Sequence, residues 1–300
     1  MIAGTPTPST VVPAGDAAIR HGLSLRGMIR SEWIKLRSIG STWWMYAALL
    51  VMTVGIGTQM SSSTSFAWLG DEQPTQMGMQ AAAVNAMILG ADINVLVVGV
   101  LGVLVIAGEY NTGMIRSTFT AVPRRVPVLL AKAMVFAVVT FLVGILSLAI
   151  TVPMSIGILA GNGIDVRLDD PHYWRAVIGS LVYVVLVGLI AFGIGAILRN
   201  IAGGIALALG LVLVAPIALG LVSGVGPQLV LRNVSLLFPI NLGRALTAHP
   251  GYPDFAAPGE PPVRLEGLLV LEPWQGALGL VVWVVVLFAA AVVLLKRRDA

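Results

Sequence analysis

The chain has 300 residues, of which 57% are hydrophobic and only 11% are charged, and its mean hydropathy is +0.94. Soluble domains carry about a quarter of their residues as charged side chains, so this composition excludes an ordinary soluble fold and predicts a protein surrounded mainly by lipid. The absence of cysteine excludes disulfides, thiolate metal sites and cysteine nucleophiles. The net charge of +4 is too sparse to indicate a nucleic-acid partner.

Residues 1–24 are rich in proline, threonine and small side chains and contain no apolar core of the kind found in a secretory signal. We expect them to form a disordered cytoplasmic tail. Residues 25–38 then place apolar side chains at helical spacing, namely Leu25, Met28, Ile29, Trp33 and Leu36. The basic side chains lie largely elsewhere on the helical wheel, which favours an amphipathic helix on the anionic inner leaflet over a solvated basic linker.

Six apolar stretches are long enough to cross the hydrocarbon core, which requires about 20 helical residues. They cover approximately residues 43–60, 88–107, 128–151, 176–198, 203–222 and 276–295. Strands of alternating polarity are missing from the pattern, so helices are expected to satisfy the backbone hydrogen bonds. The predicted fold class is therefore an all-α polytopic membrane protein with six transmembrane helices.

The orientation follows from the basic residues of the loops and tails. The side that holds both termini has 13 Lys and Arg and four Asp and Glu, a net charge of +9, whereas the other side has five basic and ten acidic residues, a net charge of −5. The positive side is expected to be cytoplasmic, which places the N-terminus and the C-terminus inside.

Residues 228–248 are apolar enough to be mistaken for a seventh span. Two arginines inside this stretch, Arg232 and Arg244, each cost up to about 3 kcal/mol on insertion, which cancels the gain from the apolar residues. A seventh span would also place the basic C-terminus outside. We therefore expect short amphipathic helices on the outer surface, broken at Pro239.

The loop at residues 108–132, GEYNTGMIRSTFTAVPRRVPVLLAK, is the most informative part of the chain. Asn111 or Thr112 can cap a short helix over residues 113–120, and two prolines, Pro123 and Pro127, prevent that helix from continuing into the third span. The loop is thus predicted to form a rigid cytoplasmic projection. Its charged residues suit docking to a soluble protein, and they are Glu109, Arg116, Arg124 and Arg125.

This loop resembles the coupling-helix region of type-2 ABC exporter permeases. The family pattern is matched by Glu109, Gly113, Ile115, Arg116, Pro123, Arg125 and Lys132, while Met114 replaces the usual threonine. The segment SEWIKLRS, which contains Glu32, Trp33, Lys35 and Arg37, is similar to the elbow helix of that family. FPINLGRALTA at residues 238–248 is similar to its outer segment between spans five and six, and the C-terminal stretch is similar to actinobacterial members.

The resemblance implies a six-span permease domain over residues 25–300 in a bacterial plasma membrane. It further implies a dimer of permease chains, homomeric or heteromeric, that binds two copies of a separate ABC ATPase. This chain is not expected to be an enzyme or to need a cofactor, because a P-loop requires a Gly-Lys pair. Its only lysines, Lys35, Lys132 and Lys296, follow Ile34, Ala131 and Leu295, so ATP and Mg²⁺ would be bound by the partner.

Few polar residues occur inside the predicted spans. Asp92 and Asn94 lie near the outer end of span two; they could mark a transport pathway, although a solvated helix end is the favoured interpretation for Asp92. Lys132 is expected to snorkel to the cytoplasmic face. The three histidines, His21, His172 and His249, have no second ligand at helical spacing, so no metal site is predicted.

Three functions remain open at this point. The first is the permease of an ABC exporter for hydrophobic or amphiphilic compounds such as drugs, antibiotics or lipid-like molecules. The second is a membrane anchor or sensor that works with an ABC ATPase without transporting anything. The third, an intramembrane enzyme or a secondary carrier, is disfavoured because the spans contain no histidine cluster, paired acids or Ser/Lys dyad.

Overall fold

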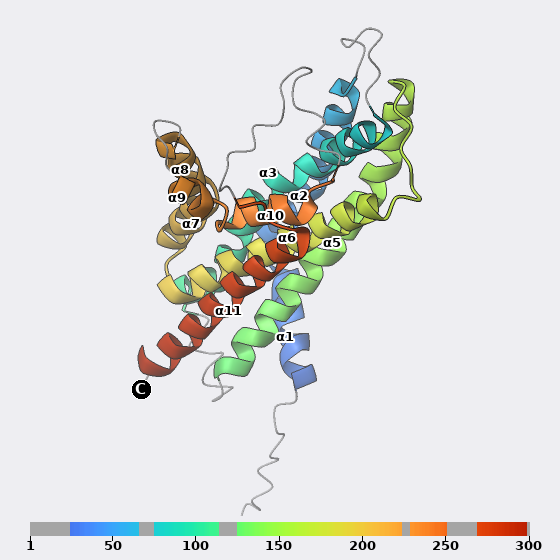
Figure 1. Ribbon diagram of the computed structural model, residues 1–300. Helices are drawn as coiled ribbons and strands as arrows, with labels where there is room; N and C mark the ends of the chain where they lie inside the picture. Colours follow the sequence, from blue (N-terminus) through green and yellow to red (C-terminus); the bar gives the residue numbers. More distant parts are fainter. Residues whose placement is uncertain (1–24, 66–74, 114–124, 224–228, 251–268, 299–300) are drawn as a thin grey trace, which may run out of the picture.

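A computed structural model describes residues 25–65, 75–113, 125–223, 229–250 and 269–298. All regular elements among these residues are helices, and the long ones run roughly side by side as a tilted bundle (Figure 1). Five of them are long and apolar enough to span a membrane by themselves, and the first helical pair meets the same test when it is taken together. The prediction of a polytopic all-α membrane protein is confirmed.

The predicted amphipathic helix and the first predicted span each form one helix, and the two are joined by a sharp bend. Helix α1 (Leu25–Ser38) meets α2 (Gly40–Ser63) at Ile39, and the chain bends there by 79°. Ile39 has an extended backbone, with φ −90° and ψ 105°, which ends one helix and starts the next. Helix α1 buries Met28 and Leu36 and exposes Trp33 and Ile34, so the apolar residues of this segment cover two faces and not one stripe.

The second and third spans extend well beyond the predicted bounds. Helix α3 covers Gln76–Asn111, and its N-terminus is capped by the Thr75 hydroxyl, which accepts a hydrogen bond from the amide of Gly78. Helix α5 covers Arg125–Gly161 and contains Pro153 in its interior. Hydropathy therefore underestimated both helices, because their outer turns pack against each other and against neighbouring loops.

The fourth span, α6 (Pro171–Leu198), is the centre of the bundle and packs against α3, α5, α10 and α11. The fifth span is interrupted. Helix α7 (Ile201–Leu209) passes through a π-helical turn (Gly210–Val214) into α8 (Ala215–Ser223), which holds Pro216. Pro216 has no amide hydrogen to donate to the carbonyl of Val212. This missing helical hydrogen bond is consistent with the change to π-helical bonding in the turn just before Pro216.

Between spans five and six lie two short helices, α9 (Leu229–Ser235) and α10 (Pro239–Thr247), and the sixth span follows as α11 (Pro273–Arg298). The predicted break at Pro239 is confirmed, because this residue starts α10. Helix α10 lies across α6 (Figure 1) and packs one face against both α6 and α11, while the Arg244 side chain on its other face is 60% exposed, as expected of an amphipathic surface helix. Close packing is possible because Gly243 faces the Tyr183 ring and Gly276 faces the α10 backbone.

The start of α6 is tied to the end of α10 by polar contacts. Asp170 caps α6 by accepting a hydrogen bond from the His172 amide at 2.8 Å, and its other carboxylate oxygen lies 2.9 Å from Nε2 of His249. Burial raises the pKa of Asp170, but the hydrogen bonds and the two nearby imidazoles outweigh that effect and lower the pKa below 3.8. Asp170 therefore stabilises the folded state in its ionised form.

Asp170→Asn is expected to remove an acid-sensitive contribution to stability of about 1 kcal/mol, after allowance for partial exposure. The unfolded pKa of aspartate is about 3.9 and the folded pKa is lower, so this contribution is present above pH ~4 and is lost as the pH falls through the folded value. Asparagine preserves the helix cap. The unfolding temperatures of the wild type and of Asp170→Asn, measured in nanodiscs from pH 3 to 7, should differ most at neutral pH and converge in acid. A difference that does not change with pH would contradict the assignment.

Candidate functional site

Three helices meet at the end of the bundle where α1 lies, and each contributes charged residues. Helix α1 provides Glu32 and Lys35, the last turn of α3 provides Glu109, and the second turn of α5 provides Lys132. These four residues are called the charge cluster below. Glu109 and Lys132 flank the predicted docking loop in sequence, whereas α1 is more than 70 positions earlier, so only the fold brings all four together.

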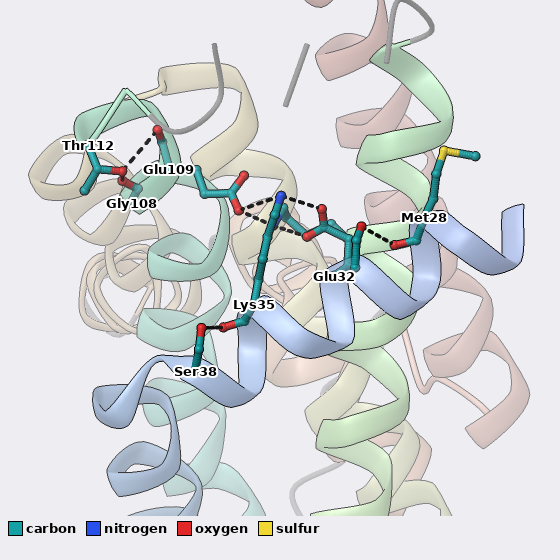
Figure 2. Close-up of polar contacts among 9 residues, drawn as sticks. Met28, Glu32, Lys35, Ser38, Gly108, Glu109 and Thr112 are labelled. Carbon is teal, nitrogen blue, oxygen red and sulfur yellow. Dashed lines mark hydrogen bonds and ion pairs between the residues drawn. The ribbon is translucent and has the colours of Figure 1, made fainter. Parts of the chain in front are cut away.

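The contacts within the charge cluster are direct. The ammonium group of Lys132 donates to Oε1 of Glu109 at 2.7 Å and also to Oε2 of Glu32. Lys35 donates to Oε1 of Glu32 at 2.8 Å and lies 3.5 Å from Oε1 of Glu109. Figure 2 shows the side chains of Glu32, Lys35 and Glu109 pointing toward one another from two helices. Two carboxylates and two ammonium groups therefore form one connected, electrically neutral network.

Three members of the charge cluster are almost completely buried. The side chains of Glu32, Glu109 and Lys132 are 3%, 5% and 6% exposed, whereas Lys35 is 28% exposed. Burial by itself lowers the pKa of Lys35, but its contacts with Glu32 and Glu109 outweigh that effect and raise the pKa above 10.5. Lys35 is therefore charged at neutral pH and neutralises the cluster from its accessible side.

This arrangement corrects one prediction. Lys132 was expected to extend to the cytoplasmic surface, but it turns inward and is buried between Glu109 and Glu32. The physical reason is electrostatic. Ion pairs with two carboxylates stabilise the buried ammonium group more than contact with the membrane interface would, provided that all three groups are desolvated together. The sequence contained the signal only in part, because nothing in it placed Glu32 next to Lys132.

The remaining predicted site residues are distributed as follows. Trp33 and Arg37 of the elbow segment are exposed, as is Asn111 at the end of α3. Gly113 adopts a positive φ of 74°, which ends α3 at the point where the predicted docking loop begins. Four predicted residues lie outside the described part of the chain, namely Ile115, Arg116, Pro123 and Arg124, and so does the predicted short helix over residues 113–120 beyond its first residue. Arg125 starts α5.

Asp92 and Asn94 are also repositioned. Asp92 was interpreted as a solvated helix end, which is wrong, because α3 continues 16 residues toward its N-terminus. Its Oδ2 accepts a hydrogen bond from Nε of Arg244 on α10 at 3.0 Å. Asn94 is 2% exposed and donates to the hydroxyl of Thr53 on α2. Both residues therefore connect helices within the bundle.

A sharply bent pair of N-terminal helices, five long apolar helices and a buried charge cluster define a multi-pass helical membrane domain. The comparison with protein families agrees with this class. Residues 28–300 match the family described as "ABC-2 family transporter protein", and the chain belongs to that family. It is thus an ABC-2 permease, a membrane component of an ABC transporter without a P-loop of its own. No curated protein gives a significant match to the chain.

Proposed function

We propose that this chain is the membrane-spanning subunit of an ATP-driven exporter for a hydrophobic or amphiphilic compound, and that a separate ABC ATPase hydrolyses the ATP. In this proposal two permease chains and two ATPase subunits form the transporter in a bacterial plasma membrane, with both termini in the cytoplasm. Family membership supports the partner class. The observation that carries the coupling step is the charge cluster.

The charge cluster is located where a force from the partner would enter the membrane domain. Gly113 and Arg125 mark the two ends of the loop proposed to dock the ATPase, which contains Arg116 and Arg124. Glu109 and Lys132 are the buried charges one turn or two inside the flanking helices, and they bind each other and Glu32. Displacing the loop would therefore move α3, α5 and α1 as one body, because separating them would expose unpaired charges to a medium of low polarity.

The class of cargo is proposed from the apolar character of the spans. The fifth and sixth spans, α7–α8 and α11, are mostly unburied within a single chain, and their exposed side chains include Val214, Ile217, Leu221, Val282 and Val285. A path lined by such surfaces favours lipid-like or drug-like molecules over ions and sugars, because the latter need polar partners at every step.

The test is purification of the chain with its ATPase, followed by activity measurements on variants. Arg116→Ala is expected to weaken the permease–ATPase complex by about 30-fold or more and to lower its transport-coupled ATPase activity, since truncating one partner of an interfacial charge pair costs roughly 2–5 kcal/mol. The matched control is Arg167→Ala, an exposed arginine on the predicted outer side, which should leave both unchanged.

Two outcomes would contradict the proposal. Failure to recover any ATPase from membranes would argue against an ABC transporter subunit. Recovery of an ATPase that responds to Arg116 but supports no ATP-dependent efflux of labelled amphiphiles from inverted vesicles would instead favour a membrane anchor or sensor.

A further inference from the structure

A cavity of about 340 Å³ lies inside the bend between α1 and α2, against α3 and α5. Its walls are largely apolar, with Leu36, Met45, Leu101, Leu104, Val105 and Val135 among the lining residues. The charge cluster forms its polar end, since all four of its members also line the cavity. This volume falls at the lower end of the range for small-molecule sites, which are mainly apolar with a few placed polar groups.

One acceptor at the polar end of the cavity is unused. Three of the four carboxylate oxygens of Glu32 and Glu109 accept bonds from lysines. The fourth, Oε2 of Glu109, is buried and has no hydrogen-bond partner among the residues that the structure describes. A buried carboxylate oxygen without a donor is costly, so the site lacks one donor. The donor need not be charged, because the four charges of the cluster already cancel.

We propose that this cavity binds a single-chain amphiphile with an uncharged hydroxyl head group, such as a monoacylglycerol or a fatty alcohol. The hydroxyl donates to Glu109 Oε2, and the chain lies along the apolar wall between α2 and α3. A carboxylate head would be repelled by Glu109, and an ammonium head would add an unbalanced charge to a buried, neutral network. Charge complementarity thus selects the head group.

The surroundings of the cavity favour a ligand that comes from the bilayer. Ile39, at the bend, lines the cavity and is 42% exposed, so the cavity lies close to the surface of the chain. Trp33 and Ile34 on the adjacent helix are exposed as well, and an apolar surface of this kind on an amphipathic helix is typical of contact with lipid. A molecule that partitions into the leaflet beside α1 can therefore reach the site.

The experiment is photolabelling of the purified chain in phosphatidylcholine nanodiscs with a monoacylglycerol that carries a diazirine in its chain. Labelled peptides should come from α2, α3 and α5 around Met45, Leu104 and Val135. The fatty acid and the fatty amine of the same chain length should label these peptides about tenfold less, the factor expected from one unfavourable polar contact. Equal labelling by all three probes would overturn the head-group assignment and indicate an apolar cavity that binds chains without selecting the head group.

A pair of tryptophan variants tests the location of the site. Leu104→Trp fills the cavity and should reduce labelling by the monoacylglycerol about tenfold. Val138→Trp places the same side chain on the exposed face of α5 and should leave labelling unchanged. Labelling of Leu104→Trp at the wild-type level would overturn the proposal. The head-group comparison uses the wild-type chain and thus does not depend on the folding of either variant, and binding is measured without an ATPase, so its failure is distinguishable from failure of the proposed function.

Discussion

Replacing Lys132 with methionine is expected to lower the unfolding free energy of the membrane domain by about 3–5 kcal/mol. The substitution conserves the length and the apolar stem of the side chain but removes the ammonium group that pairs with Glu109 and Glu32. Two carboxylates then remain buried with only Lys35, which is partly exposed. The cost is that of an uncompensated buried charge, and SDS titration in mixed micelles would measure it.

The control and the compensating variant follow from the same charges. Lys296→Met makes the identical change at an exposed lysine near the end of α11 and should alter stability by less than about 0.5 kcal/mol. Adding Glu109→Gln to Lys132→Met restores electrical neutrality through the remaining Glu32–Lys35 pair. The double variant should therefore be more stable than Lys132→Met alone. Equal stability of Lys132→Met and the wild type would show that the cluster is hydrated and does not hold the helices together.

The all-α class and the approximate positions of the apolar helices could be predicted from sequence because membrane insertion depends on local hydropathy. Their lengths could not. The outer part of α3, which starts at Gln76, contains the buried Gln80. The side-chain amide of Gln80 donates a hydrogen bond to the backbone carbonyl of Arg167 at 2.7 Å. A polar residue whose hydrogen bonds are made with a distant loop looks in sequence like a residue of a connection, so the predicted span began too late, at residue 88.

The contacts of α10 could not be predicted from sequence either. The cost of Arg232 and Arg244 excluded a seventh crossing and predicted amphipathic surface helices, but it did not indicate which residues hold α10 to the bundle. The structure pairs the exposed Arg244 with Asp92, 152 positions away, while Gly243 allows the Tyr183 ring to approach the α10 backbone. Neither partner is visible to an argument based on composition or on helical periodicity.

The candidate site divides in a similar way. Glu109 was identified because its position matches a family pattern beside the docking loop, and the elbow residues Glu32 and Lys35 were identified by the same resemblance. Their mutual contact, and the inward position of Lys132, depend on the 79° bend at Ile39. The angle of this bend is set by the backbone conformation of Ile39. The apolar patterns of α1 and α2 predict two helices but do not predict the angle between them.

The packing of α3 against α6 leads to the second large expected effect. Gly102 of α3 faces the α6 backbone so closely that a methyl group at its Cα would lie 2.4 Å from the carbonyl oxygen of Gly188 and 3.1 Å from the amide nitrogen of Phe192. Both of these atoms belong to a helix backbone and cannot rotate away as a side chain could. Close approach at small residues is how membrane helices gain packing energy when no hydrophobic effect drives their association.

Gly102→Ala is therefore expected to destabilise the folded domain by about 3 kcal/mol, the upper part of the usual range for overpacking, because relief requires the two helices to separate. Gly99→Ala is the matched control one turn earlier on α3, where the new methyl group would lie 3.9 Å from the Cβ of Ala191, an ordinary contact. Alanine there should be neutral or stabilising by up to about 1 kcal/mol, since glycine is the poorer helix former. Unfolding of both variants by SDS titration makes the comparison, and a Gly102→Ala variant as stable as Gly99→Ala would mean that α3 and α6 do not approach as closely as described. Because both substitutions add the same methyl group to the same helix, a difference between them can come only from the neighbouring backbone.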